Sequence, residues 1–237
     1  NGFVAVASTS FNSNVEAKQI LPTNEGDFVV YRVTSTGDII TFELRFWGNY
    51  IGNQSLPVDS MPCVEVYGKL ENATSFVLAT KYLESVIVSL KAITSLSNAF
   101  QTCYKLVNVD TSLWDTSNVT NMMNAFNTCT ALTKIDVSTW DTSKVTNMQN
   151  TFSSCFSLRR IIGLNELDTS KVENMAGTFG GLKCIIDFDI SKWDFSSLTN
   201  NTSMLFSNYR IPNRKIDFDE SLSIMGAQMM NSSMPLC

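Results

Sequence analysis

The chain has 237 residues, 44% of them hydrophobic, which is enough apolar material for a continuous core in one large domain or two small ones. A formal net charge of -5 disfavours nucleic-acid binding, and the absence of histidine removes imidazole metal sites and histidine-based catalysis. No apolar stretch approaches the roughly 20 residues that span a bilayer, so direct membrane insertion is not expected.

The N-terminal part of the chain predicts a β-hairpin. Phe28–Val33 and Ile39–Trp47 are rich in β-branched and aromatic residues, and a Ser-Thr-Gly-Asp turn separates them. We therefore expect residues 1–58 to form an N-terminal β cap or small docking domain, and residues 59–237 to form a second unit. The first residue is not Met and no charged leader region precedes the apolar start, so we expect a removed leader or a fragment.

The second unit repeats itself. Phe100, Phe126 and Phe152 lie 26 residues apart, and cysteine and leucine positions follow each phenylalanine at the same offsets. A repeat of this length is typical of a solenoid, in which each unit buries its apolar face only against its neighbours. Such a fold presents an extended surface, and this favours a binding or structural role over catalysis.

Each repeat predicts a strand, a turn and a helix. The strand carries apolar residues at the offsets of a leucine-rich-repeat strand, as in Leu132, Ile135 and Val137. A second apolar series falls at offsets 0, 3, 7 and 10, which match one stripe of an α-helix, and it comprises Val145, Met148, Phe152 and Cys155. Thr142 and Ser143 stand just before this series, where their hydroxyls suit a helix N-cap.

The same strand pattern predicts about seven units. The expected fold is therefore an α/β leucine-rich-repeat solenoid with a period near 26 and an N-terminal β-hairpin cap. Its strand steps begin at Val64, Val86, Val109, Ile135, Ile161, Phe188 and Ile216. The step at Ile161 is degraded by Gly163, and the irregular end units are what terminal caps require.

Three cysteines occupy one repeat position, and we expect them to be buried and unpaired: Cys103, Cys129 and Cys155. The states of Cys63, Cys184 and Cys237 stay open. Three tryptophans also share a position and are expected in the core, because Leu167 replaces one member of the series Trp114, Trp140 and Trp193. The aspartates that follow them predict turns and caps: Asp115, Asp141, Asp168 and Asp194.

The outward position of each strand step is acidic in five of the seven steps, at Glu65, Asp110, Asp136, Asp189 and Asp217. Neighbouring strands lie about 4.8 Å apart, so these charges would repel one another. One interpretation is an electronegative strip that recruits a basic partner or a divalent cation. The other is a solubilising row, relieved by nearby basic residues. The predicted binding face comprises Glu65, Asp110, Ser112, Lys134, Asp136, Ser138, Arg160, Asp189 and Asp217.

Four related motifs carry a family resemblance: WDTS at 114–117 and 140–143, LDTS at 167–170, and WDFS at 193–196, with VTNM or VENM runs after three of them. From about residue 90 to 205 the chain resembles the BspA-like leucine-rich-repeat surface proteins. That resemblance implies a right-handed β/α solenoid on a bacterial surface or in a secreted protein, often an adhesin.

We expect a non-catalytic extracellular or cell-surface module, without cofactor or metal, whose concave strand face binds a protein or glycan. The alternative is a structural component of a virion or appendage, docked to neighbouring subunits through residues 1–58. A third class, a glycoside hydrolase with paired carboxylates, is compatible with the residue types present but is disfavoured by the solenoid pattern.

Overall fold

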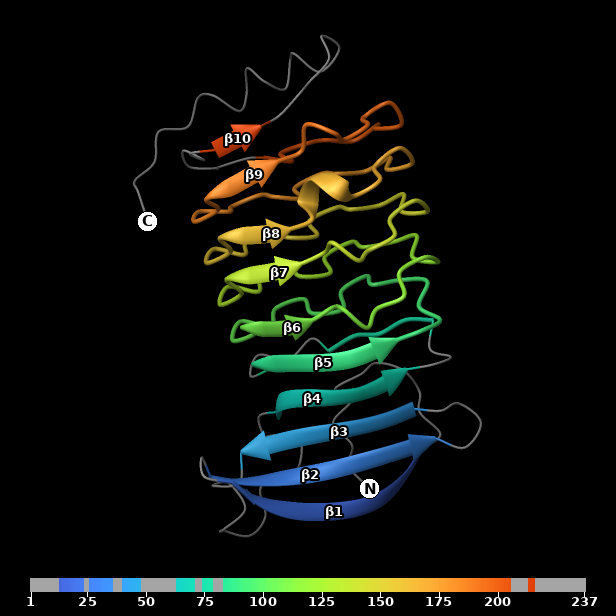
Figure 1. The fold of residues 1–237 in the computed structure, drawn as a ribbon, viewed down its shortest axis with the longest axis vertical. Helices are drawn as coiled ribbons and strands as arrows, with labels where there is room; N and C mark the ends of the chain where they lie inside the picture. Colours follow the sequence, from blue (N-terminus) through green and yellow to red (C-terminus); the bar gives the residue numbers. More distant parts are fainter. Residues whose placement is uncertain are drawn as a thin grey trace.

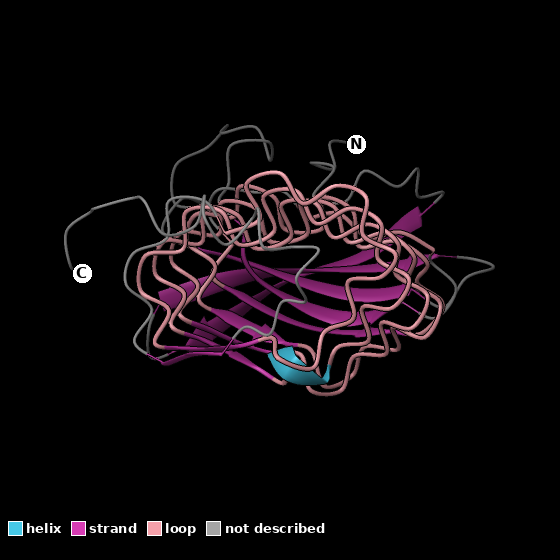
Figure 2. Cartoon of the chain, turned by 90° about the horizontal axis from the view of Figure 1, so that it is seen from above, coloured by secondary structure: helices cyan, strands magenta, loops and turns pink. Residues whose placement is uncertain are grey.

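The computed structural model describes residues 13–23, 26–35, 40–47, 63–70, 74–78, 83–205 and 213–215. Its strands stack in one column from β1 to β10, with a turn or coil crossing behind each later strand (Figure 1). Viewed along the stack, the strands occupy one side of a flattened coil and irregular segments form the other (Figure 2).

The first strands form an antiparallel sheet that runs without a break into the repeats. Antiparallel pairing joins β1 (Ser13–Thr23), β2 (Gly26–Ser35), β3 (Ile40–Trp47) and β4 (Cys63–Leu70). Parallel pairing then joins β4 to β5 (Ser85–Leu90) and β5 to β6 (Asn108–Asp110). The two segments expected as a hairpin lie in β2 and β3. One sheet spans β1 to β6, so the strands before and after residue 58 belong to the same sheet. A domain boundary near residue 58 therefore stays a prediction.

The later strands are short, parallel and regularly spaced. They are β7 (Lys134–Asp136), β8 (Arg160–Ile162), β9 (Asp187–Asp189) and β10 (Asn213–Lys215), with β7 paired to β8 and β9 to β10. From β6 onward each strand begins 26 or 27 residues after the one before. This spacing, together with the buried aromatic ladder described below, identifies a repeat solenoid.

The prediction of an α-helix in each repeat is wrong for the described residues, whose only helical segment is the 3-10 turn η3 (Leu164–Glu166). Between residues 122 and 129, every second backbone N–H donates to a carbonyl of the next coil at 2.8 to 2.9 Å. Of the intervening N–H groups, Met123 donates to Asn121 Oδ1, and those of residues 125, 127 and 129 donate three residues back. Asn124 and Thr128 adopt positive φ values of 57° and 65°. In an α-helix each N–H donates to the carbonyl four residues earlier in the same segment. These successive turns therefore have a different backbone conformation, although their buried residues have a similar spacing.

A ladder of stacked aromatic rings fills the core. Ring centroids are 5.1 Å apart between Phe100 and Phe126, 5.7 Å between Phe126 and Phe152, and 6.0 Å between Phe152 and Phe179. Trp114 and Trp140 stack at 5.8 Å, and all these side chains are buried. The expectation that the tryptophans belong to the core is confirmed. Aromatic burial on this scale is a large apolar contribution to stability.

The indole N–H groups of the tryptophans differ in their partners. Trp193 Nε1 donates to the Leu164 carbonyl at 2.9 Å. Trp114 Nε1 and Trp140 Nε1 are buried and have no hydrogen-bond partner in the part of the chain that the structure describes. The acceptor for Trp193 comes from η3, a feature of one coil.

The column of repeated cysteines is confirmed as buried and free. Each Sγ donates to a backbone carbonyl of the preceding coil, at 3.0 to 3.1 Å: Cys103 to Leu78, Cys129 to Phe100 and Cys155 to Phe126. Burial raises the pKa of the Cys129 thiol well above its usual value and that of Cys155 to about 12. These thiols therefore pack as small apolar groups with one weak donor each. Cys184 is disulfide-bonded.

Truncation of the central phenylalanine tests the ladder. Phe126→Ala should lower the free energy of unfolding by about 3 to 5 kcal/mol, because it leaves a cavity between two stacked rings. Leu113, whose side chain is 51% exposed, provides the control, and Leu113→Ala should cost much less. Urea unfolding followed by tryptophan fluorescence measures both. Equal losses would contradict the assigned core.

The difference between the Trp193 and Trp140 indoles gives a second test. Trp193→Phe should destabilise the chain by about 1 kcal/mol more than Trp140→Phe, because it strands the Leu164 carbonyl whereas the other change deletes an unpaired N–H. The two substitutions remove the same atoms from equally buried rings, each 6% exposed, so the difference reports mainly the hydrogen bond. Denaturant midpoints of the two variants give this difference, and a larger loss for Trp140→Phe would refute the assignment.

Candidate functional site

We call the exposed side of β6 to β9 the strand face. Side chains alternate between exposed and buried in β7 and β8, so that Ile135 and Ile161 enter the core while their neighbours face out. Of the predicted binding residues, Ser112, Lys134, Asp136, Ser138 and Arg160 are exposed, and Asp110 and Asp189 are partly buried. The structure therefore places these seven on or beside one surface.

The structure departs from the predicted acidic column at β4 and at β10. Glu65 pairs with Ser85, and Tyr67 occupies the position opposite Ile87, so β4 is offset by two residues from the expected alignment. Lys215, not Asp217, pairs with Asp189, while Asp217 and the expected step at Ile216 lie outside the described residues. Val64 and Val66 both fit the strand pattern, which is why the sequence alone cannot choose between the two offsets. The acidic column reduces to Asp110, Asp136 and Asp189.

These three aspartates have a local structural role. Each carboxylate accepts the backbone N–H of the serine two residues later at 3.0 Å, and the same serine hydroxyl donates at 2.6 to 2.7 Å, in the pairs Asp110–Ser112, Asp136–Ser138 and Asp189–Ser191. Such Asx turns end a strand. The Ser138 hydrogen bonds, with a smaller contribution from Lys134, hold the pKa of Asp136 below its usual value.

A second row of aspartates forms the same kind of turn a few residues after the first row in each coil. Asp115, Asp141, Asp168 and Asp194 each accept an N–H from a serine two residues on, as expected for turn residues. The threonine between Asp141 and Ser143 is buried and bonds to the next coil, since Thr142 Oγ1 donates to the Asp168 carbonyl at 2.9 Å. Thr142 therefore links two coils and is not the helix cap that the sequence suggested.

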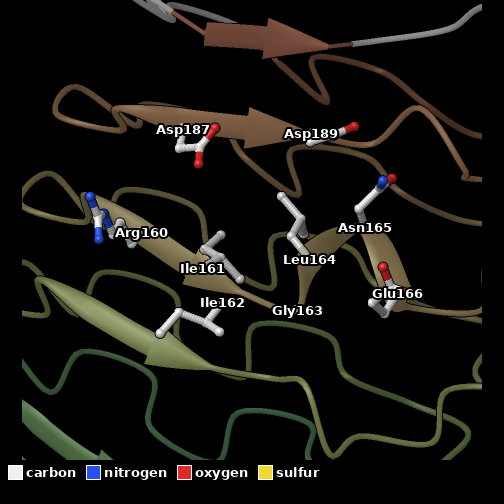
Figure 3. A pocket seen from close by; sticks show the side chains of 9 residues that line it. All are labelled: Arg160, Ile161, Ile162, Gly163, Leu164, Asn165, Glu166, Asp187 and Asp189. Atoms are coloured by element: carbon white, nitrogen blue, oxygen red, sulfur yellow. The ribbon is translucent and has the colours of Figure 1, made fainter.

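A pocket of about 390 Å³ opens on the strand face between β8, η3 and β9 (Figure 3). Its lining consists of Arg160, Ile161, Ile162, Gly163, Leu164, Asn165, Glu166, Asp187 and Asp189. The pocket exists because this coil departs from the repeat in two ways. Ile162 stands where the neighbouring coils have aspartate, and one additional residue lies between the strand and Leu167.

Gly163 allows the additional residue to be accommodated. Its φ is 79°, and a Cβ atom there would lie 2.4 Å from Ser138 Cα in the neighbouring coil, so only glycine fits. The chain then turns outward as η3 and forms one wall of the pocket. Sequence reasoning noted the degraded step at Gly163 but missed the pocket, whose walls come from two coils.

Other kinds of site find no support in the described part of the chain. No group of three potential metal-ligating side chains occurs there. Within the same ranges, no helix has the length and apolar character that crossing a bilayer requires. Trp114, Trp140 and Trp193 are only 4 to 6% exposed and offer no platform for a sugar ring.

The aspartate turns predict a specific acid response. Hydrogen bonds from Ser143 and Ser170 lower the pKa of Asp141 and Asp168 below the usual 3.8, so both favour the folded state when ionised. This stabilisation is present above pH 4 and is lost as the pH falls through the lowered pKa values. Asp141→Asn/Asp168→Asn should therefore show a smaller loss of stability between pH 5 and pH 3 than the wild type. Urea midpoints at the two pH values measure this, and parallel losses would contradict it.

Comparison with known proteins gives one family. A family model described as "Mycoplasma protein of unknown function, DUF285" matches residues 94–219, which is more than half of the chain. No curated protein and no solved structure matched the chain.

Proposed function

Because the chain belongs to the DUF285 family, a leucine-rich-repeat-like family described as of unknown function, we propose a role from its surface: a non-catalytic module that binds a partner protein through the strand face. The WDTS and VTNM motifs support placing its repeats with the BspA-like surface proteins. The proposal includes an extracellular location, which that resemblance suggests. The disulfide at Cys184 supports it, because disulfides persist in oxidising compartments.

The observation that carries the proposal is the difference between inward and outward positions of the repeat. Inward positions hardly change from coil to coil, as the phenylalanine ladder and the buried series Val119, Val145 and Val172 show. One outward position, by contrast, is Asn108, Lys134, Arg160 and Asp187 in successive coils, and the position before it is Val107, Thr133, Arg159 and Ile186. All eight side chains are exposed. Folding does not dictate these residues, so the strand face is free to serve recognition.

The chemistry of the strand face suits a protein partner. Val107 and Leu113 expose apolar surface near β6. Basic side chains lie exposed at the starts of β7 and β8, namely Lys134, Arg159 and Arg160, and Asp187 begins an acidic area on β9. Interleaved apolar, basic and acidic patches provide specificity and steer association in protein–protein contacts. A face for nucleic acid would instead be predominantly basic.

The test uses the full chain, immobilised and exposed to a panel of purified extracellular-matrix proteins, serum proteins and glycans. Lys134→Ala/Arg159→Ala removes two charges from the strand face, and we expect it to weaken binding to a protein in the panel about tenfold. The control is Lys144→Ala/Lys171→Ala, which removes the same charge from exposed positions outside the strands and should have less than about a twofold effect.

Three outcomes would count against the proposal. Equal loss in both variants would indicate unspecific charge attraction. Binding to glycans alone would exclude a protein partner. Assembly of the chain into regular particles, with no binding to the panel, would favour the structural alternative of a virion or appendage component.

A further inference from the structure

We propose that the pocket between β8, η3 and β9 receives a lysine or arginine side chain of the partner protein. This inference rests on the proposed function, since it names the chemistry that one part of the strand face recognises. Four features of the pocket carry it: its charge, its apolar floor, an ion pair at its rim and its size.

The charge of the lining is predominantly negative. Asp187 and Asp189 line the pocket from β9, Glu166 lines it from η3, and Arg160 lies at the opposite end from Glu166 (Figure 3). The lining thus includes three carboxylates and one guanidinium. A ligand that brings positive charge complements this lining.

The floor of the pocket is apolar where the coils on either side carry aspartate. Ile162 is 39% exposed and occupies the position held by Asp136 in the preceding coil. Leu164 extends this surface toward η3. The methylene groups of lysine and arginine pack on apolar surface while their charged ends reach polar groups. No aromatic ring lines the pocket, and this argues against a stacked sugar.

The rim already holds an ammonium group. Lys192 Nζ lies 2.6 Å from Glu166 Oε1, and the two side chains are 61% and 64% exposed. An ion pair this exposed contributes about 0 to 1 kcal/mol, so an incoming cation can replace Lys192 at little cost. The contact shows that the geometry of η3 presents Glu166 to a lysine side chain.

The size of the pocket fits one such side chain. A volume of about 390 Å³ is near the lower end of the roughly 300 to 1,000 Å³ found for ligand sites. Arg160, Ile162 and Asp187 of the lining are exposed on the strand face, so a side chain can enter from solvent while its backbone stays outside.

The experiment titrates the full chain with the capped peptide acetyl-Gly-Ser-Lys-Ser-Gly-amide at low salt and follows backbone amide shifts by NMR. We expect shifts centred on residues 160–166 and 187–189. Asp187→Asn/Glu166→Gln should weaken binding about fivefold or more, as the loss of two exposed charge contacts predicts. Ile162→Ser should weaken it about two- to threefold through the lost apolar contact.

The matched control is Asp115→Asn/Glu173→Gln, which removes one aspartate and one glutamate charge from exposed positions outside the pocket. It should change the affinity less than twofold. Replacing the peptide lysine with glutamine should abolish the shifts, and Arg160→Ala should strengthen binding because it removes a like charge.

Several results would overturn the inference. They are equal weakening by the pocket variant and its control, shifts that avoid the pocket, or tighter binding of the free diamine cadaverine than of the peptide, which would indicate a small-molecule site. These results leave the proposed function standing if Lys134→Ala/Arg159→Ala still impairs partner binding, because neither of those residues lines the pocket. Loss of that effect would instead remove the proposed function itself.

Discussion

Hydrogen bonds between successive coils are the constraint on which the rest of the structure depends. Strands of three residues supply few of them, and the segments opposite the strands supply more, since every second N–H there bonds to the next coil. Threonine hydroxyls and asparagine side chains add contacts between coils. Thr116 donates to the Asp141 carbonyl of the next coil, and Asn124 donates to Asn98 of the preceding coil. Each coil must therefore match its neighbour residue by residue, and this fixes both the period and the stacking of the aromatic rings.

The fixed period explains why an additional residue is accommodated in a turn and not in a strand or in the hydrogen-bonded segment opposite it. The coil that contains β8 has one residue more than the coil before it, and the extra length emerges at η3 while Phe152 and Phe179 remain stacked. Elsewhere an inserted residue would displace a whole ladder of hydrogen bonds. The pocket therefore forms because the extra residue leaves the hydrogen bonds between coils in register. The same turn presents the Leu164 carbonyl, which accepts a hydrogen bond from the Trp193 indole.

The sequence allowed the buried residues to be predicted, but it did not allow the backbone conformation between the strands to be predicted. Phe126, Cys129 and Trp140 could be assigned to the core because a repeated apolar residue has the same environment in every coil. The helix could not be excluded, because a run of overlapping three-residue turns buries apolar residues at the same offsets of 0, 3, 7 and 10. A signal was present in Asn98, Asn124 and Asn150, since asparagine tolerates positive φ better than most residues. The pocket and the offset of β4 depend on which residues of two coils face each other, and one repeat read alone does not contain that information.

The two stacked tryptophans make the coil spacing optically visible. Trp114 and Trp140 lie with ring centroids 5.8 Å apart and an interplanar angle of 13°. Indole transitions at this separation couple as excitons, so the near-ultraviolet circular dichroism of the folded chain carries a paired band that neither chromophore gives alone. The band's amplitude depends on the distance and angle between two consecutive coils. It therefore reports slippage at the centre of the stack without any added label.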